Sequence, residues 1–349
     1  MADKFRIALS GDFRKADGSP TFPDFDLAPL QSAPGVEVAF LENANPIRAD
    51  QLADFDALIL LVPRFGKESV HPNGRLSAVA RFGVGYDNVD VPACTEAGIP
   101  LVITPDGVRR PVAVSIMAFM LALTGKMLIK DKLTRGGPET FNKRAEHMGV
   151  GLVGRTLGSI GIGNIGAELF RLARPFDMKF IAHDPYADKS VAAELGIELV
   201  GLEALFRRAD VLCVNCPLTA ETRHLVNAER LALMKPTAYL INTARGPIVD
   251  QKALTQVLAA RRIAGAGLDV LEQEPPEADD PILKLDNVVL APHALCWTDQ
   301  CFAGNGAADV KAVLDIQHGR VPTGVVNRAV LDQPRFKARL DAYRGRFGA

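Results

Sequence analysis

The stretch Leu157-Gly158-Ser159-Ile160-Gly161-Ile162-Gly163-Asn164-Ile165-Gly166, with Lys179-Phe180-Ile181-Ala182-His183-Asp184 after it, decides the fold. Its apolar runs and glycines predict a strand, a tight turn, a helix over 164–175 and a second strand that ends at an acid. Gly161 allows the sharp turn, Gly163 lets backbone N–H groups approach a pyrophosphate, and Gly166 lets the helix pack closely on the sheet. The pattern therefore predicts a dinucleotide-binding site.

The residues around this turn indicate which dinucleotide is bound. The helix that starts at Asn164 would direct its free N–H groups at the phosphates. Asp184 ends the second strand, where a carboxylate accepts hydrogen bonds from the ribose hydroxyls of NAD and repels the extra phosphate of NADP. A glycine pattern alone is a weak signal, because glycines also collect in ordinary turns. Together with Asp184 it favours NAD as the cofactor.

Size, charge and cysteine content exclude several classes of protein. A chain of 349 residues exceeds the usual limit for one core, so we expect two domains. Forty basic and 41 acidic residues leave a net charge of −1, and neither nucleic acid nor a membrane surface is expected as a partner. Five scattered cysteines do not resemble a secreted disulfide framework, and no apolar run reaches membrane length. We expect a cytoplasmic protein.

Short apolar runs alternate with helical patterns in two parts of the chain. This alternation predicts an α/β fold with two doubly wound, parallel-sheet domains of the Rossmann type. A long helix is expected over 112–128 and another over 307–318, and the basic segment after Arg335 is expected to be a solvated helix face. The strands are expected near 5–9, 36–40, 57–62, 76–80 and 101–103, and then near 158–162, 179–183, 211–215, 238–242, 264–269 and 288–291.

Three segments place a charged or titratable residue at the carboxyl end of a predicted strand. They are Asn242-Thr243-Ala244-Arg245-Gly246, Leu268-Asp269-Val270-Leu271-Glu272-Gln273-Glu274-Pro275 and Ala291-Pro292-His293. An arginine can hold a carboxylate with two parallel hydrogen bonds, and an imidazole can give or take a proton near neutral pH. Each residue alone would be read as a surface salt bridge or a turn histidine. Their shared placement favours a chemical site.

The cysteines and the other histidines give no metal site. Cys213 and Cys216 have the spacing of metal and redox sites, but on a strand they would point to opposite faces. We interpret both as structural or cofactor-lining. The remaining histidines have no ligand-like spacing, and no metal is expected.

Several strings together give the chain a specific resemblance. Arg81-Phe82-Gly83-Val84-Gly85-Tyr86-Asp87-Asn88-Val89-Asp90, the glycine turn, Cys216-Pro217-Leu218-Thr219 and the segment 242–246 follow one another in order. From about Leu58 to Asn327 the chain resembles the D-isomer-specific 2-hydroxyacid dehydrogenase family, which includes D-3-phosphoglycerate dehydrogenase and the glyoxylate and hydroxypyruvate reductases. The resemblance implies NAD-dependent interconversion of a small D-2-hydroxy acid and its 2-oxo acid, with a substrate such as phosphoglycerate or hydroxypyruvate.

The resemblance also assigns residues. Arg245 would bind the substrate carboxylate and carbonyl, His293 would donate and accept the proton, and Glu274 would pair with the histidine. The substrate would further contact Arg64, Gly83, Val84 and Gly85. The cofactor would contact Gly161, Gly163, Asn164, Ile165, Gly166, Asp184, Cys216, Thr243, Ala244 and Asp269.

The family architecture gives domain boundaries and an assembly. Residues 1–105 and 293–349 would form the substrate domain and residues 106–292 the NAD domain, with the active site in the cleft between them. A homodimer is expected to form through the helix around 107–130. No partner other than this copy and the 2-hydroxy or 2-oxo acid is expected.

Some features leave alternatives open. C-terminal-binding corepressors share the fold and the three catalytic residues, so a protein that senses NAD(H) is the alternative function. Formate dehydrogenase fits less well, because the family position where it has glutamine is Glu274. Val108, Val114 and Cys296-Trp297 depart from the family pattern and unsettle the substrate assignment. Arg109 and Arg110 would read a charged substrate, or else form a salt bridge across the dimer or to Asp106.

Overall fold

The computed structural model describes residues 4–348, which form two compact units. Unit 1 takes the chain up to Val108 and again from Trp297, and unit 2 takes Arg109–Cys296. The family architecture had suggested boundaries after residues 105 and 292. His293 falls in unit 2, where its backbone N–H donates to Asp269 O (2.7 Å).

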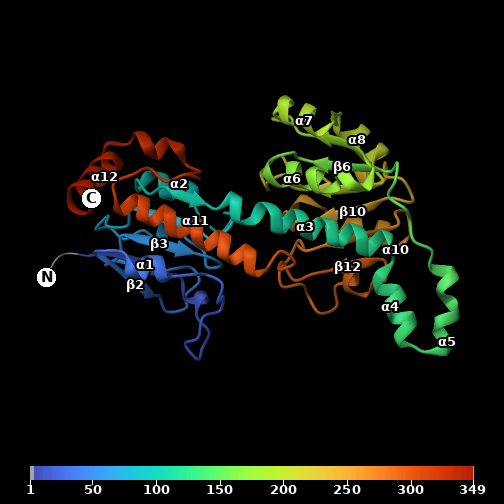
Figure 1. Ribbon diagram of the computed structural model, residues 1–349, viewed down its shortest axis with the longest axis horizontal. Coiled ribbons are helices and arrows are strands. Elements are labelled where there is room, and N and C mark those ends of the chain that lie inside the picture. The colour runs from blue at the N-terminus through green and yellow to red at the C-terminus, as the bar shows by residue number, and fades with distance from the viewer. Residues whose placement is uncertain (1–3, 349) are drawn as a thin grey trace. The chain divides into compact units, whose positions relative to one another are not determined.

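Unit 1 is built on a five-stranded sheet of parallel strands in the order β2-β1-β3-β4-β5 (Figure 1). The strands agree with the sequence pattern to within three residues: β1 Phe5–Leu9, β2 Val36–Phe40, β3 Ala57–Leu60, β4 Ala78–Arg81 and β5 Leu101–Ile103. Alternate residues of β3 enter separate cores, Ala57 and Ile59 on one face and Leu58 and Leu60 on the other. Both faces of the sheet are thus covered, as a parallel sheet requires. The covering helices are α1 Ala28–Ser32, α2 Val91–Glu96, α11 Asp299–Gln317 and α12 Pro334–Phe347.

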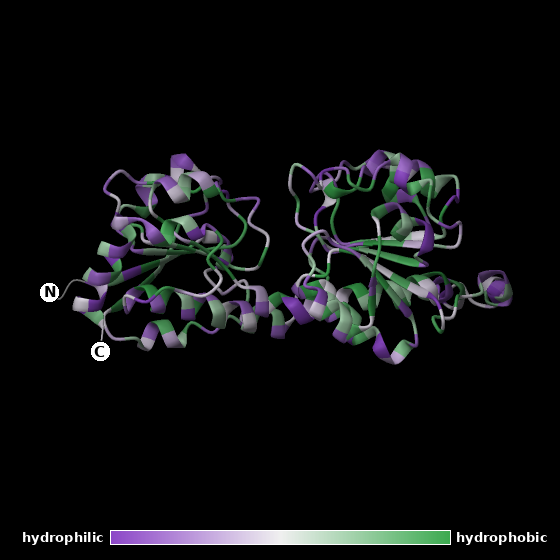
Figure 2. Cartoon of the chain, turned by 90° about the horizontal axis from the view of Figure 1, so that it is seen from above, coloured by the Kyte–Doolittle hydropathy of each residue, from purple (hydrophilic) through white to green (hydrophobic). Residues whose placement is uncertain are grey.

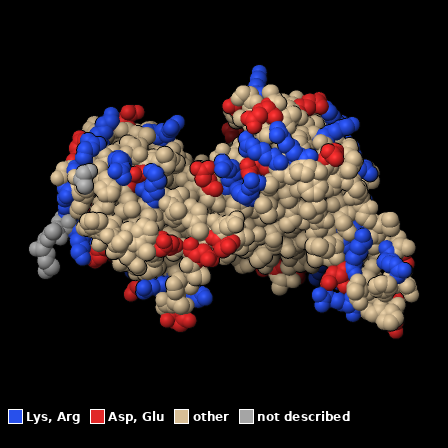
Figure 3. All heavy atoms as spheres, viewed as in Figure 1, with Lys and Arg blue, Asp and Glu red and all other residues tan. Residues whose placement is uncertain are grey.

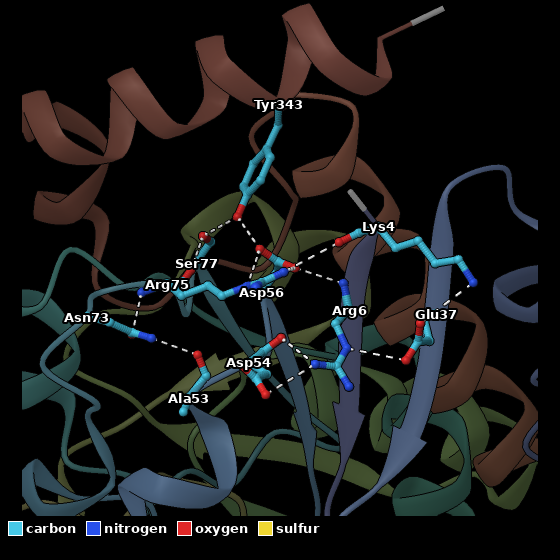
Figure 4. A network of polar contacts seen from close by, with 10 residues as sticks. All are labelled: Lys4, Arg6, Glu37, Ala53, Asp54, Asp56, Asn73, Arg75, Ser77 and Tyr343. Atoms are coloured by element: carbon cyan, nitrogen blue, oxygen red, sulfur yellow. Dashed lines mark hydrogen bonds and ion pairs between the residues drawn. The ribbon is translucent and has the colours of Figure 1, made fainter. Parts of the chain in front are cut away.

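The C-terminal helix α12 is docked and not merely solvated. Phe336 and Leu340 are buried in the core of unit 1. Figure 4 shows how Tyr343 reaches the sheet: its hydroxyl donates to Asp56 Oδ1 (3.0 Å), while Arg75 donates to both oxygens of the same carboxylate. Burial, followed by the charge of Asp56, raises the pKa of Tyr343. The basic tail is therefore a helix with a buried face.

Unit 2 contains a seven-stranded parallel sheet in the order β12-β11-β10-β9-β6-β7-β8. The chain starts in the centre at β6 and adds strands first on one side and then on the other, so the direction reverses between β6 and β9. Ligands of open α/β sheets bind at the carboxyl ends of strands at this reversal. The strands are β6 Thr156–Ile160, β7 Lys179–His183, β8 Ile197–Leu199, β9 Val211–Val214, β10 Tyr239–Asn242, β11 Gly265–Leu268 and β12 Val288–Leu290.

The helices of unit 2 cover both faces of this sheet, and Figure 2 shows apolar strands between more polar helices. The expected helix over 112–128 is in fact α3, which begins at Pro105, contains Pro111 and ends at Thr124. Lys126 then takes a left-handed conformation and starts α4. The other helices are α4 Met127–Arg135, α5 Pro138–Phe141, α6 Asn164–Ala173, α7 Lys189–Leu195, α8 Leu202–Arg208, α9 Ala228–Leu231 and α10 Gln251–Ala259.

Two surface properties bear on the partners. Among the described helices, α3 alone is long and apolar enough to cross a membrane by length and composition, and 67% of that stretch is buried inside the protein. Because most of that stretch is buried, α3 is a core helix.

Acidic and basic side chains are interspersed on the face shown in Figure 3, in keeping with the net charge of −1.

Candidate active site

The glycine turn after β6 has a separate geometric reason for each glycine. Gly161 has a φ of +93°, which side chains rarely adopt, and a Cβ there would lie 2.9 Å from Asn215 O. A Cβ on Gly163 would meet no atom within 4 Å, so the space above it is open to a ligand. A Cβ on Gly166 would lie 2.5 Å from Gly161 O, because α6 packs directly on the turn. Asn164 and Ile165 form the first turn of α6 and present its free N–H groups there.

Two polar side chains that the sequence patterns did not single out hold this turn. Ser159 donates from Oγ to Gly161 O (2.6 Å), and Asn215 donates from Nδ2 to Ser159 Oγ (2.9 Å). Since Asn215 follows β9, these bonds link the carboxyl ends of the two strands at the sheet reversal. A small polar residue inside an apolar strand was the available signal for Ser159.

Asp184 lies at the end of β7 and faces the same turn. Its Oδ2 accepts from Ile162 N and its Oδ1 accepts from Tyr186 N, both at 2.9 Å. Each carboxylate oxygen can accept more than one hydrogen bond, so capacity remains for the hydroxyls of a ribose. The Asp184 carboxylate is half-buried, and these two backbone hydrogen bonds fix its orientation.

The turn after β10 is organised by Asn242, which is 1% exposed. Its amide donates to Arg245 O (2.9 Å) and accepts from Ala244 N (3.0 Å). The turn between these residues carries Thr243, whose Oγ1 is buried without a hydrogen-bond partner among the described residues. A buried hydroxyl of this kind needs a partner, and a bound ligand can supply one.

Asp269 joins the carboxyl end of β11 to the segment that carries the histidine. Its Oδ1 accepts from Ala294 N (3.0 Å) and Leu295 N (3.1 Å), and its backbone O accepts from His293 N. Burial raises the pKa of Asp269, and the two N–H bonds lower it without offsetting the burial. His293 itself has a φ of 55°, a strained conformation for a residue with a side chain.

His293 and Glu274 form a hydrogen-bonded pair, with Nδ1 and Oε2 separated by 2.8 Å. Burial raises the pKa of the Glu274 carboxyl, but the hydrogen bond and charge of His293, with the Leu271 N–H and the charge of Arg245, bring it below its usual value. Glu274 is therefore ionised near neutral pH. The hydrogen bond with Glu274 occupies Nδ1 of the His293 imidazole, and both side chains stay partly exposed. Nε2 of His293 is therefore the atom placed to exchange a proton with a ligand.

Arg64 and the loop Gly83-Val84-Gly85, which are also expected to contact the substrate, lie in unit 1. Arg64 is exposed, and its backbone is fixed by bonds of Arg64 N to Asn45 Oδ1 (2.9 Å) and of Ile47 N to Arg64 O (2.9 Å). Gly83 has a φ of +125°, and its N–H donates to Thr104 Oγ1 (2.8 Å). The loop Gly83-Val84-Gly85 follows directly from β4, at the carboxyl end of its sheet.

The residues of unit 2 fit a dinucleotide cofactor. The open space over Gly163, the first turn of α6 and the Asp184 carboxylate match the pyrophosphate and ribose, and the orphaned hydroxyl of Thr243 lies in the loop after β10, at the same edge of the sheet. Among residues 4–348 there is no group of three or more His, Cys, Asp or Glu side chains that could hold a metal ion.

The remaining sequence candidates are placed as follows. Cys213 enters the core on one face of β9 and Cys216 packs against the core of the other, as the strand geometry predicts. Burial raises the pKa of the Cys216 thiol to about 11, so it is a neutral group beside the turn. Arg110 pairs with Glu168 of the same chain (Nε to Oε1, 2.9 Å), so it forms a salt bridge with a partner other than the expected Asp106 or a residue across the dimer. Trp297 is 48% exposed and packs edge-on against Phe22 and Phe302.

A second histidine–glutamate pair lies beside Arg245 and was not identified from the sequence. His224 Nε2 and Glu272 Oε1 are 2.5 Å apart, and Glu272 Oε2 accepts from Gln251 N (3.1 Å). His224 N donates to Pro247 O (2.9 Å), next to the turn that holds Arg245. Since the partners are far apart in sequence, spacing gave no signal; a histidine at a positive φ is visible only in the structure.

Known proteins match both the sequence and the fold. The family model of the D-isomer specific 2-hydroxyacid dehydrogenase, NAD binding domain, matches residues 117–294. A glyoxylate reductase of Korarchaeum cryptofilum is 39% identical over 287 residues, which is 81% of this chain and 86% of that protein. A D-3-phosphoglycerate dehydrogenase of Methanocaldococcus jannaschii is 37% identical over 306 residues, 86% of this chain and 57% of that one. The solved structure of a 2-hydroxyacid dehydrogenase from Ketogulonicigenium vulgare has a TM-score of 0.78 at 30% identity and covers 93% of this chain and 99% of its own.

Proposed function

Because this chain belongs to the D-isomer specific 2-hydroxyacid dehydrogenase family, we propose that it interconverts a small D-2-hydroxy acid and its 2-oxo acid with NAD(H). It is an oxidoreductase that uses a nicotinamide cofactor. The observation that carries the proposal is the His293–Glu274 pair beside the Arg245 turn, in a unit whose glycine turn fits a dinucleotide. The alternative of a corepressor that senses NAD(H) has no support among the related proteins.

Each residue of this group has a part in the reaction. Arg245 holds the carboxylate and the 2-oxo oxygen of the substrate and draws electron density from the carbonyl carbon. A nicotinamide cofactor held by unit 2 would supply the hydride for that carbon. His293, protonated beside the Glu274 carboxylate, donates a proton from Nε2 to the oxygen that becomes the hydroxyl. In the opposite direction the neutral imidazole takes that proton back.

The cofactor is NAD and not NADP. Asp184 supports this proposal, since its carboxylate lies at the end of β7 and is fixed toward the glycine turn by Ile162 N. A phosphate on the 2′-hydroxyl would meet this negative charge. We place the adenosine ribose at Asp184 and the nicotinamide beside Thr243, Ala244 and Asp269.

The substrate carries a polar group in addition to its carboxylate. A D-3-phosphoglycerate dehydrogenase, named for a substrate with a phosphate, is among the relatives described above, and Arg64 is an exposed cation on a fixed backbone. Arg109 is the second candidate for reading that group. Arg110 is accounted for by its ion pair with Glu168 and has no part in this proposal. In the loop Gly83-Val84-Gly85, the backbone N–H groups of Val84 and Gly85 donate to the carboxylate, since that of Gly83 is bonded to Thr104 Oγ1.

The protein acts in the cytoplasm as a homodimer. The segment Met127–His147 consists of α4, α5 and a 3-10 helix (Asn142–His147), and none of these three has a buried residue. Large apolar side chains are exposed on and near it, including Leu121, Met127, Leu128, Phe141 and Met148. Such a surface marks an interaction site, and a second copy of unit 2 would cover it.

A turnover assay tests the proposed activity. The purified protein is mixed with NADH and with glyoxylate, hydroxypyruvate, phosphohydroxypyruvate or pyruvate, and NADH oxidation is followed. We expect turnover of at least one acid. The kcat/KM should be larger for hydroxypyruvate or phosphohydroxypyruvate than for pyruvate. Binding of NADH without turnover of any of them would favour a sensor over an enzyme.

A further inference from the structure

A chain of buried hydrogen bonds holds the start of the glycine loop 83–85. Gly83 N donates to Thr104 Oγ1 (2.8 Å), and Thr104 N donates to Gly83 O (2.9 Å). The Thr104 hydroxyl in turn donates to Asn305 Oδ1 (2.8 Å). Thr104 is 1% exposed and Asn305 is 4% exposed, so water does not compete for these bonds.

The chain brings together three elements from distant parts of the sequence. Gly83 follows β4, Thr104 stands between β5 and α3, and Asn305 lies in α11. Close packing leaves this arrangement little freedom, because a Cβ on Gly107 would lie 2.2 Å from Asn305 Oδ1 and 2.5 Å from Asn305 N. The Thr104 hydroxyl therefore links Gly83 to α11, in addition to the backbone bond from Thr104 N to Gly83 O.

One turn further along α11, a buried carboxylate lies near the same loop. Asp309 is 0% exposed, and neither of its oxygens has a hydrogen-bond partner among the described residues. The positive charge that acts on it is that of Arg81, at the end of β4. Arg81 Nη1 lies 2.1 Å from the place that a Cβ on Gly83 would take. α11 thus presents two buried polar groups toward the base of the loop.

We propose that Thr104 and Asn305 are positioning residues for substrate binding, which fix the Gly83 backbone so that the N–H groups of Val84 and Gly85 are presented to the substrate carboxylate. This inference rests on the proposed function, because it takes the loop as the carboxylate site. Neither side chain touches the substrate; Asn305 orients the Thr104 hydroxyl, and Thr104 holds Gly83. A Val at position 104 keeps the shape of the side chain but leaves Gly83 N–H buried without an acceptor.

A control pair of residues lies at the opposite end of β5, the strand that precedes Thr104. Asn327 donates to Thr95 Oγ1 (3.1 Å) and accepts from Leu101 N (2.8 Å), which begins β5. This second Thr–Asn pair is part-buried, its hydroxyl accepts from the asparagine and donates to Val91 O (2.8 Å), and it lies at the end of β5 away from the loop. Thr95→Val removes a hydrogen-bonded hydroxyl without changing the loop 83–85.

The test compares Thr104→Val, Thr104→Ser and Thr95→Val with the wild type. For Thr104→Val we expect KM for the best 2-oxo acid to rise about 5- to 50-fold, the range for a buried donor that loses its partner, while kcat stays within about twofold. Thr104→Ser retains the hydroxyl and should restore KM. Thr95→Val should lower the thermal midpoint but not change KM. The Kd of NADH, from its fluorescence, should be unchanged in all four proteins.

Three results would overturn the inference. They are an unchanged KM in Thr104→Val, a KM that rises equally in Thr95→Val, and a failure of Thr104→Ser to restore KM. If Thr104→Val does not fold, two variants of Asn305 take the place of the two Thr104 variants. Asn305→Leu removes the acceptor of the Thr104 hydroxyl and must raise KM. Asn305→Asp keeps the Oδ1 acceptor and must leave KM unchanged. A wild type that reduces no 2-oxo acid overturns the proposed function and this inference with it, whereas a wild-type turnover with unchanged variants overturns the inference alone.

Discussion

At the scale of single residues, the imidazole of His293 is the group whose removal should affect chemistry and not binding. Its Nδ1 is held by Glu274 at 2.8 Å, and its backbone is held by Asp269. We predict that His293→Ala lowers kcat about 10²- to 10⁴-fold, the range for loss of a general acid, with the Kd of NADH unchanged. Steady-state kinetics and a fluorescence titration check this. Turnover at the wild-type rate would remove His293 from the mechanism.

The choice of cofactor is also decided by one residue. Asp184→Ala should weaken NADH binding more than NADPH binding, because it removes both an acceptor for the ribose and a negative charge. Asp184→Asn is the matched control, since its amide oxygen can still accept from Ile162 N and keep the loop in place. It should therefore admit NADPH with a smaller loss of NADH affinity. A wild type that uses both cofactors equally well contradicts the assignment.

How far the site can be read from the sequence depends on how far apart its members are. Arg245, Glu274 and His293 each follow a predicted strand, and parallel strands bring their carboxyl ends to one edge, so their grouping in unit 2 is predictable. The His224–Glu272 pair and the Thr104–Asn305 bond join residues 48 and 201 positions apart, with no periodic pattern to relate them. Only the packed structure defines such pairs.

At the scale of elements, the sequence predicts what apolar periodicity controls. The strands of both sheets follow from it, except β8, a three-residue edge strand that contains Glu198. Helix ends are set by local geometry instead: α11 starts at Asp299 because Thr298 caps it, with Oγ1 accepting from Cys301 N (3.2 Å). The expected start near Ala307 missed this cap, since the first turns of α11 are rich in Gly, Asn and Cys, residues that weaken the apolar pattern.

The buried carboxylate of α11 should make stability depend on pH. Burial raises the pKa of Asp309 well above its ordinary value, against the charge of Arg81, the charged group that acts on it in the described structure. A group whose pKa is raised by folding favours the folded state at low pH, and that contribution is lost as the pH rises from about 4 through the folded pKa. The wild type should therefore lose stability relative to Asp309→Asn as the pH rises.

Urea unfolding at pH 5 and pH 8 measures this dependence. We expect the urea midpoint of Asp309→Asn minus that of the wild type to be larger at pH 8 than at pH 5. Asp315→Asn on the same helix is the control, since Asp315 is paired with Lys311 (2.5 Å) and Arg320 (3.0 Å) and its loss should destabilise the protein at pH 8. A difference between Asp309→Asn and the wild type that does not vary with pH would contradict the argument.

At the scale of the whole molecule, the exposed segment after α3 should decide the assembly. Met127 is 58% exposed at the start of α4, a helix with no buried residue. We predict a homodimer by light scattering, and we predict that Met127→Glu produces monomers, because a charge would be buried in the interface. Val321→Glu, at a comparably exposed apolar site in unit 1, should leave the dimer intact. Equal masses for all three proteins at micromolar concentration would place the interface elsewhere.

Isotope transfer measures most directly whether this chain moves a hydride between a nicotinamide cofactor and C2 of a small acid. The protein is incubated with the best substrate among hydroxypyruvate, phosphohydroxypyruvate and pyruvate, whose products are chiral at C2, and with NADH that carries deuterium at both C4 positions. The product acid is analysed by mass spectrometry and chiral chromatography. We predict a 2-hydroxy acid of D configuration with one deuterium at C2 per NADH consumed. A product without deuterium, an L product, or no product from any 2-oxo acid would contradict the account.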